Sequence, residues 1–385
     1  MFAIRLYSRT SPRRPPSRKN NLLQSSLTQI QRFIQANLRR YGYQLSRSAN
    51  LSASPDDALF RSLAPGSKTQ TFTIALVGTL ESGLYGIGKV SPALYFPKFG
   101  YALSKLGVSL VAYRDPVDAL LNIGNHDPAR TAFILVYNED FQRELLPKFA
   151  DLASNTEFRF YNAPLAGQIA GDKRTTNEVF SKAGIPVPLV AGIESTSKVF
   201  SNAPIGSHAT TTVIDIGWPL DKSLYNTVAI DTAHDYKGKS YYVALRTLAV
   251  TGTMISAYAR LRPTGEAEIS VHASDTPKDP DLISHFHAVL VDANRHRLTQ
   301  LCEQIGYVLG PGFYAHDILP CRETGELVVC ETGFKFDDED YREALWPISS
   351  DLPFLMDHFT VAIADLAAAA IAEQCFGKAI TNKPE

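Results

Sequence analysis

The sequence predicts two folded units of different class, an α/β unit followed by a larger α+β unit. In the first unit, short apolar runs alternate with helical patterns, as in a parallel sheet covered by helices. In the second, strand-like runs follow one another and are combined with a long helical pattern. The length of 385 residues fits two or three domains. We expect a basic arm with a linker over residues 1–70, the α/β unit over 71–161 and the α+β unit over 162–385.

Charge is unevenly spread along the chain. The sequence holds 38 basic and 39 acidic residues, but residues 1–55 contain ten basic residues and no acidic one. The rest of the chain therefore has 28 basic against 39 acidic groups, a net charge of −11. Within the basic arm, Leu22–Tyr43 predicts an amphipathic helix, because apolar residues recur there at spacings of three and four.

Several functions fit such an arm. A basic amphipathic helix can lie on an anionic membrane surface or bind nucleic acid or an acidic partner. An Arg- and Ser-rich segment without acids also resembles an organelle transit peptide. The plainest alternative is a solvated tail whose helix packs on its own domain. The sequence leaves these alternatives open.

The composition indicates a globular protein without a membrane span. No stretch reaches the ~20 apolar residues that a transmembrane helix needs. The four cysteines are too scattered for a disulfide framework or a zinc site. We interpret them as reduced thiols and expect a cytoplasmic protein, with organelle targeting through the arm as the alternative.

The α/β unit begins with a buried strand and a glycine-rich loop. The predicted strands are Phe72–Val77, Val108–Tyr113, Thr131–Tyr137 and Phe158–Tyr161, and the predicted helices are Pro97–Leu106 and Phe141–Leu152. The loop after the first strand reads GTLESGLYGIG and lacks the GxGxxG pattern of dinucleotide sites. We interpret it as a sharp turn, with a substrate pocket as the alternative.

The second unit starts at Asn162 with two helices separated by Asp172-Lys173. Strands are then predicted over Lys198–Ser201, Thr212–Ile216, Thr227–Asp231, Tyr241–Val250 and Met254–Leu261. A long helix over Leu282–Ile305 precedes a hairpin of Phe313–Pro320 and Glu326–Thr332, and the chain ends in a helical stretch, Leu352–Phe376. This mixture of antiparallel strands and helices is typical of an α+β domain.

The most specific prediction of a binding site concerns two residues of the hairpin. A turn near residues 324 and 325 places Asp317 opposite Glu331 or Thr332. Facing side chains on such a pair lie ~5 Å apart, so two carboxylates there would repel each other without a cation. Magnesium prefers one or two protein carboxylates together with phosphate oxygens. The alternative is that the carboxylates point to solvent at a strand end, but apolar neighbours on both strands favour the metal role.

Three segments together resemble the ATP-grasp superfamily, in particular its branch of ribosomal-protein glutamate ligases and glutathione synthetases. They are NAPLAGQIAGDKRTTNEVFSKAGIPVP, YYVALRTLAVTGTMISAYARLRP and HDILPCRETGELVVCETG, and the resemblance covers roughly residues 162–340. Their order and spacing carry more of the resemblance than any single motif does. The preceding unit resembles the Rossmann-like domain that usually comes before an ATP-grasp module. The resemblance therefore implies an ATP-grasp fold preceded by a Rossmann-like domain.

The resemblance also implies chemistry. It suggests an ATP- and magnesium-dependent ligase that joins a small-molecule or peptide carboxylate to an amine or thiol through an acyl phosphate. Arg246, Arg260 and His272 fall at catalytic positions of the family, although His272 could equally be structural. Residues implied to bind ATP are Lys173, Lys198, Gly206, Ser207, Ile230 and Asp231. Residues implied to bind magnesium are Asp317, Glu331 and Asp337. His316 is expected on the opposite strand face.

The sequence departs from the family at several of these positions. Lys198 lies earlier than the family's second lysine, and Ser201 or Asn202 stands in its place. Gly333 replaces the asparagine that completes the metal site in the family, so Asp337, Asp338 or water would have to substitute. An acidic residue of the family is replaced by Ala244. These differences leave two further hypotheses, a catalytically silent nucleotide-binding or scaffold protein, and a nucleotide-sugar or dinucleotide enzyme that uses the loop Gly83–Gly88.

Overall fold

The computed structural model describes residues 72–77, 99–100, 102–113, 116–135, 146–155, 157–192, 198–205, 212–215, 219–265, 270–334, 339–355 and 362–377. The basic arm, the linker and the loop Gly83–Gly88 lie outside these residues, as do Gly206, Ser207, Asp337 and Asp338. Their predicted roles stay predictions. No helix within the described ranges is long and apolar enough to cross a membrane.

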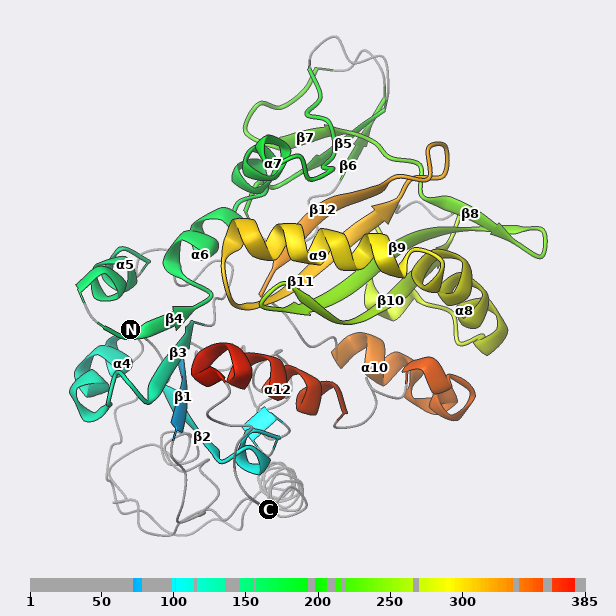
Figure 1. The fold of residues 1–385 in the computed structure, drawn as a ribbon. Coiled ribbons are helices and arrows are strands. Elements are labelled where there is room, and N and C mark those ends of the chain that lie inside the picture. Colours follow the sequence, from blue (N-terminus) through cyan, green and yellow to red (C-terminus); the bar gives the residue numbers. More distant parts are fainter. Residues whose placement is uncertain are drawn as a thin grey trace, which may run out of the picture.

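The first unit contains a parallel sheet, as the sequence predicted. Its strands β1 (Phe72–Val77), β2 (Val108–Tyr113), β3 (Thr131–Leu135) and β4 (Arg159–Tyr161) pair in the order β2-β1-β3-β4. β1 and β3 lie in the middle, and β3 is buried along its whole length, which explains its continuous apolar run. Helices α4 (Pro116–Asn122) and α5 (Leu146–Asn155) lie beside this sheet in Figure 1. We did not predict α4.

The second unit begins with two helices and a small sheet. Helix α6 (Pro164–Ala170) is followed by α7 (Lys173–Lys182). Asp172 caps α7 by accepting hydrogen bonds from the backbone amides of Arg174 and Thr175, so the helix begins at the predicted Asp-Lys pair. Strands β5 (Val199–Asn202), β6 (Thr212–Ile214) and β7 (Tyr225–Val228) form the small sheet in the order β6-β5-β7.

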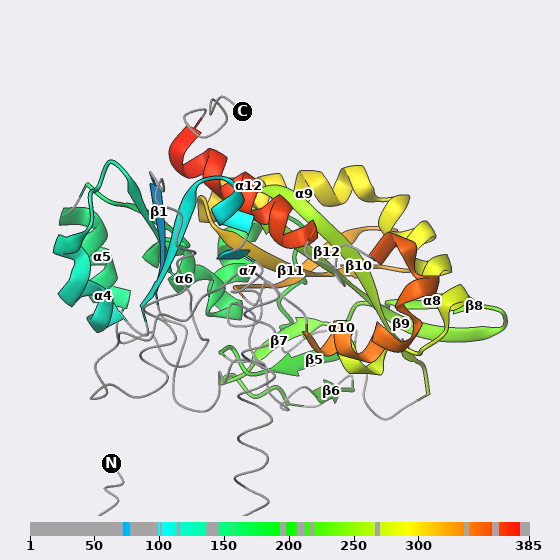
Figure 2. The ribbon, with the colours of Figure 1, turned by 90° about the horizontal axis from the view of Figure 1, so that it is seen from below.

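The large sheet contains the predicted hairpin. Its order is β10-β9-β11-β12, with β8 pairing to the start of β9. These strands are β8 (Ala233–Tyr236), β9 (Lys239–Val250), β10 (Thr253–Pro263), β11 (Phe313–Pro320) and β12 (Leu327–Gly333). Figure 2 shows α9 (Arg295–Leu309) on one side of this sheet and the small sheet on the other.

The expected long helix over Leu282–Ile305 is wrong as a single element. The chain forms α8 (Pro280–Phe286), then a π-helical stretch, His287–Asp292, and only then α9. The wide π turns end before Asn294, whose φ of −107° and ψ of 9° leave the helical region. The C-terminal stretch is also divided. The predicted stretch Leu352–Phe376 contains the 3₁₀ turn Pro353–Leu355 before α12 (Ala362–Phe376), and it is preceded by α10 (Glu339–Leu345) and the 3₁₀ turn Trp346–Asp351.

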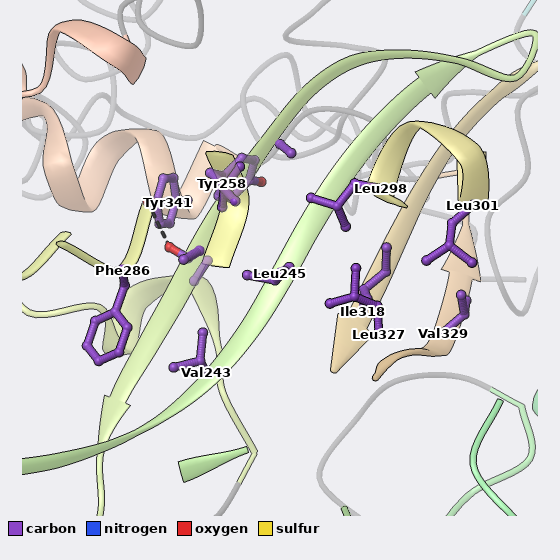
Figure 3. Close-up of a cluster of buried hydrophobic side chains, with 14 of the residues drawn as sticks. Val243, Leu245, Tyr258, Phe286, Leu298, Leu301, Ile318, Leu327, Val329 and Tyr341 are labelled. Atoms are coloured by element: carbon purple, nitrogen blue, oxygen red, sulfur yellow. Dashed lines mark hydrogen bonds between the residues drawn. The ribbon is translucent and has the colours of Figure 1, made fainter. Parts of the chain in front are cut away.

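Apolar side chains from α9 cover one face of the large sheet. Leu298 and Leu301 of this helix belong to the same buried cluster as Ile318, Leu327 and Val329 of the hairpin, and Figure 3 shows them side by side. Because side chains alternate along a strand, the residues between these apolar ones face the other side of the sheet. That other side faces the small sheet.

Helix α12 joins the parallel sheet to the large sheet. Ile363, Ala367 and Ile371 lie in one buried cluster with Ile74 of β1 and Leu248 of β9. The helix is rich in alanine, so its small side chains allow both sheets to approach it closely. The C-terminal end of the chain therefore helps to fix the first unit on the second.

A buried asparagine makes a second connection between the two sheets. Asn162, which follows β4, donates a side-chain hydrogen bond to the carbonyl of Leu135 at the end of β3. It accepts one from the backbone amide of Phe313, the first residue of β11. Its φ of 52° is left-handed, a region that asparagine tolerates better than most residues. A side chain at Gly312 would collide with its amide oxygen.

We expect Asn162→Ala to lower the free energy of unfolding by about 2–4 kcal/mol, because it removes two buried hydrogen bonds that join the two sheets. Urea denaturation followed by circular dichroism measures this. The control is Asn294→Ala. Asn294 also donates one side-chain hydrogen bond and accepts one, but at the protein surface. An equal loss in both variants would contradict the proposed connection.

Candidate active site

A cavity of about 440 Å³ lies between the small sheet and the large sheet. One part of its lining is neutral and partly aromatic, and the other part is charged. The neutral side chains include Phe200, Tyr225, Val228, Ile230, Tyr242 and Leu319, and the charged ones are Lys173, Arg246, Arg260, Asp317 and Glu331. A concave, mostly apolar site with a few convergent polar groups is typical of small-molecule binding. Seven of the predicted site residues, these five with Ile230 and His272, are thus brought together.

A row of charged side chains lines the cavity on the side of the large sheet. Asp317 of β11 pairs in register with Arg246 of β9 on one side and with Glu331 of β12 on the other. Directly paired residues project from the same face of a sheet, so the three side chains lie together. Arg260 of β10 joins them from the next strand, since its backbone partner is Ala244. The predicted pairing of Asp317 with Glu331 is confirmed.

Asp317 is held by both arginines. The Nη1 atoms of Arg246 and Arg260 lie 2.8 and 3.3 Å from the same oxygen, Oδ1 of Asp317. The two arginine side chains are only 7% and 12% exposed, so these ion pairs are shielded from water. A buried charge is stable only when it is paired and hydrogen-bonded, and here two positive groups share one negative group. The sequence analysis assigned the arginines to catalytic positions and did not predict this contact.

Glu331 has a cationic neighbour from another element. Nζ of Lys173, in the first turn of α7, lies 3.7 Å from Oε1 of Glu331. The lysine side chain is only 9% exposed, although lysine is usually solvated. Helix α7 therefore brings a point charge to the carboxylate end of the row.

A β-bulge adds a thiol to the cavity. Asp317 pairs with Glu331, but the next residue of β11, Ile318, pairs with Val329, so Cys330 is the extra residue. The bulge allows both Cys330 and Glu331 to line the cavity, although consecutive residues normally face opposite sides. Burial raises the pKa of the Cys330 thiol well above its usual value, and the carboxylates of Asp317 and Glu331 raise it further.

The other face of the hairpin, opposite to these charged side chains, is buried and also contains polar groups. His316 is fully buried, and its Nδ1 lies 3.0 Å from the hydroxyl of Thr332, its partner across the hairpin. Burial lowers the pKa of His316 to about 3, and the positive charge of Arg246 adds to this effect. The ring is therefore neutral. As predicted, His316 lies on the face opposite to Asp317.

His272 lies at the rim of the cavity in a fixed turn. Its backbone amide donates to Oδ2 of Asp275, and its backbone carbonyl accepts from the amide of Asp275, which together fix the start of the 3₁₀ turn Ala273–Asp275. Arg262 of β10 donates to the same carboxylate oxygen and to the carbonyl of Ser270. The turn is thus attached to the large sheet, with the exposed His272 among the residues that line the cavity.

Other predicted nucleotide-binding residues are placed differently. Lys198 lies outside the cavity lining, where its exposed side chain is 3.7 Å from Asp215. Of Ser201 and Asn202, the two candidates for the position where the resemblance predicts a lysine, Asn202 lines the cavity. Asp231 is exposed and accepts a hydrogen bond from the amide of Ala233, so it caps β8 and does not line the cavity. Ile230 does line it, and its backbone amide and carbonyl have no hydrogen-bond partner among the described residues.

Comparison with solved structures finds a synthetase, a ligase and an ATP-grasp domain protein. N5-carboxyaminoimidazole ribonucleotide synthetase from Thermotoga maritima aligns over 81% of this chain and 76% of its own, with 12% identity and a TM-score of 0.44. D-alanine–D-alanine ligase from Bacillus anthracis aligns over 79% and 99%, with 11% identity and a TM-score of 0.45. A RimK-domain ATP-grasp protein from Sphaerobacter thermophilus aligns over 78% and 99%, with 14% identity and a TM-score of 0.43. The chain is similar to ATP-grasp proteins. No protein-family model and no curated protein sequence matches it.

The carboxylates of Asp317 and Glu331 could bind a magnesium ion that also contacts a bound phosphate. Asp317 and Glu331 offer carboxylate oxygens from facing positions, which suits magnesium when phosphate and water complete its coordination. Among the residues that the structure describes, no group of three or more His, Cys, Asp or Glu side chains could hold a metal by itself. The described chain thus offers a partial ligand set and not a closed metal site.

We expect Cys330 to react slowly with iodoacetamide at pH 7, more slowly than Cys321, which is also half-buried but lies outside the cavity lining, because the Cys330 thiolate is disfavoured inside the cavity. Mass spectrometry of the alkylated peptides measures both rates in one sample. Denatured protein serves as the control, in which the two rates should converge. Fast modification of Cys330 in the folded protein would contradict its assigned position.

Proposed function

We propose that this protein is an ATP- and magnesium-dependent ligase that joins a carboxylate to an amine or thiol. The observation that carries the proposal is the cavity between two sheets, whose lining combines neutral, partly aromatic side chains with charged ones. A nucleoside triphosphate has the same combination, with a flat apolar base at one end and a polyphosphate at the other. The parallel sheet before this site supports the part of the proposal in which a Rossmann-like domain precedes an ATP-grasp module.

The neutral part of the lining suits an adenine ring. Phe200, Tyr225 and Tyr242 provide apolar and aromatic surface. The backbone amide and carbonyl of Ile230, which lack partners among the described residues, provide one donor and one acceptor at the same place. An adenine edge offers a ring nitrogen that accepts and an amino group that donates. We therefore place the base beside Ile230.

The charged part of the lining suits the phosphates and the reacting acid. Lys173 supplies a compact positive charge, and Arg246 and Arg260 supply planar guanidinium groups that bind oxyanions in a bidentate manner. Asp317 and Glu331 would hold magnesium, which supplies charge neutralisation for the phosphate oxygens. His272 lies at the rim, in reach of a substrate that enters the cavity. Gly206, Ser207 and Asp337 remain proposed contributors outside the described residues.

The proposed reaction has two steps. A carboxylate oxygen of the acid attacks the γ-phosphorus of ATP, the bond to the β,γ-bridging oxygen breaks, and ADP leaves. The amine or thiol then attacks the acyl carbon, phosphate leaves, and one proton is released from the nucleophile. Because little covalent chemistry falls to the protein, its contribution would be to position the groups and stabilise charge.

The two lysines allow a matched test of nucleotide binding. We expect Lys173→Met to weaken binding of ADP with magnesium about ten- to a hundredfold, since a charge-assisted contact is worth about 1.5–3 kcal/mol. Lys198→Met should change the affinity less than about twofold, because this exposed side chain lies outside the cavity lining. Isothermal titration calorimetry measures both. Equal effects of the two substitutions would contradict the placement of the phosphates.

A catalytically silent nucleotide-binding protein is the second candidate, because Gly333 lines the cavity without offering a ligand. Release of ADP in the presence of a panel of acids, amines and thiols separates the two candidates. For a ligase, we expect at least one pair to stimulate release and Asp317→Asn to abolish the stimulation. Nucleotide binding without any stimulated turnover would favour the silent protein, and binding of NADH at the first unit would favour a dinucleotide enzyme.

A further inference from the structure

The charged row contains more positive than negative side chains. Lys173, Arg246 and Arg260 face Asp317 and Glu331, which gives these five groups a net charge of +1. A divalent cation that approached the two carboxylates alone would meet three positive groups within a shielded cavity. Charges near a protein surface at ~4 Å interact by about 4 kcal/mol at an effective dielectric constant of 20, so this arrangement opposes the ion.

The two arginines also occupy one of the two carboxylate oxygens that Asp317 could offer to a metal. Both guanidinium groups approach Oδ1 of Asp317, at 2.8 and 3.3 Å. A cation at this carboxylate must therefore displace at least one guanidinium group or share the carboxylate with it. When a polyphosphate is present, the displaced arginine gains a new oxyanion partner, and the phosphate adds the negative charge that the row lacks.

We infer that Arg246 and Arg260 make the metal site conditional, so that the divalent cation enters only together with the nucleotide. The inference rests on the proposed function and adds a binding order to it. Because thermodynamic coupling is reciprocal, the factor by which nucleotide tightens metal binding equals the factor by which metal tightens nucleotide binding. The two arginines set the size of that factor in addition to binding phosphate.

Manganese provides the probe, since it accepts the same oxygen ligands as magnesium and its free ion is observed by electron paramagnetic resonance. Titration of the full-length protein with Mn²⁺ should show weak binding without nucleotide and much tighter binding with ADP. We expect Arg260→Met to tighten the binding of Mn²⁺ alone at least about tenfold, because one positive charge beside Asp317 is removed. Arg260→Lys, which keeps the charge, should give less than about a threefold change.

Arg262→Met is the matched control. Arg262 lies two residues further along β10, is 11% exposed and forms an ion pair with Asp275 instead of Asp317. Its substitution should leave the affinity for Mn²⁺ alone unchanged within about twofold. Circular dichroism confirms that each variant is folded. If Arg260→Met is unfolded, Arg260→Gln, which keeps hydrogen-bonding capacity but no charge, provides the same test.

The outcomes separate the inference from the function on which it rests. Tight binding of Mn²⁺ alone by the wild-type protein, or no gain in Arg260→Met or its substitute, would overturn the inference while nucleotide binding still stood. Absence of ADP binding in calorimetry, with or without metal, would instead overturn the proposed function. Tighter Mn²⁺ binding in Arg260→Met, together with a smaller effect of ADP on it, would support both.

Discussion

The register of β11 between β9 and β12 decides what the cavity can bind. In the observed register Asp317 lies between Arg246 and Glu331 on the face toward the small sheet, and His316 is buried on the face toward α9. A shift by one residue would exchange the two faces. It would bury Asp317 among the apolar side chains of α9 and place His316 in the cavity. Every function considered for this site therefore depends on the alignment of one strand.

Several contacts fix that alignment. At the start of β11, Asn162 accepts a hydrogen bond from the amide of Phe313. At the hairpin turn, Arg297 of α9 donates to the carbonyl of Gly325. Between these ends, the buried hydrogen bond of His316 to Thr332 exists only in this register. Because the His316 ring is neutral, this bond places no net charge in the apolar layer, and the charges remain on the cavity side.

Sequence reasoning succeeded at the hairpin, whose geometry is local, but missed contacts between distant segments and the irregular turns within the expected long helix. The hairpin turn alone places Asp317 opposite Glu331, so that pair could be predicted. The contact of Arg246 with Asp317 joins residues 71 positions apart, and its register depends on sheet packing that periodicity does not specify. Lys198 begins a predicted strand, and the strand pattern does not show whether its side chain faces the cavity or the solvent. Only the fold shows that it is exposed. The break near Asn294 likewise follows from π-helical turns, which apolar spacing does not indicate.

Helix α7, which begins with Lys173, contacts both sides of the cavity. Arg174 of the same helix donates to the carbonyls of Lys222, Ser223 and Leu224, and Asn177 donates to the hydroxyl of Tyr225 in β7. Helix α7 is therefore attached to the small sheet, while its first residue pairs with Glu331 of the large sheet. Phe180 of the same helix also packs in the buried cluster of the large sheet. Lys173 is therefore held between the two sheets, and its position beside Glu331 depends on the contacts that helix α7 makes with both.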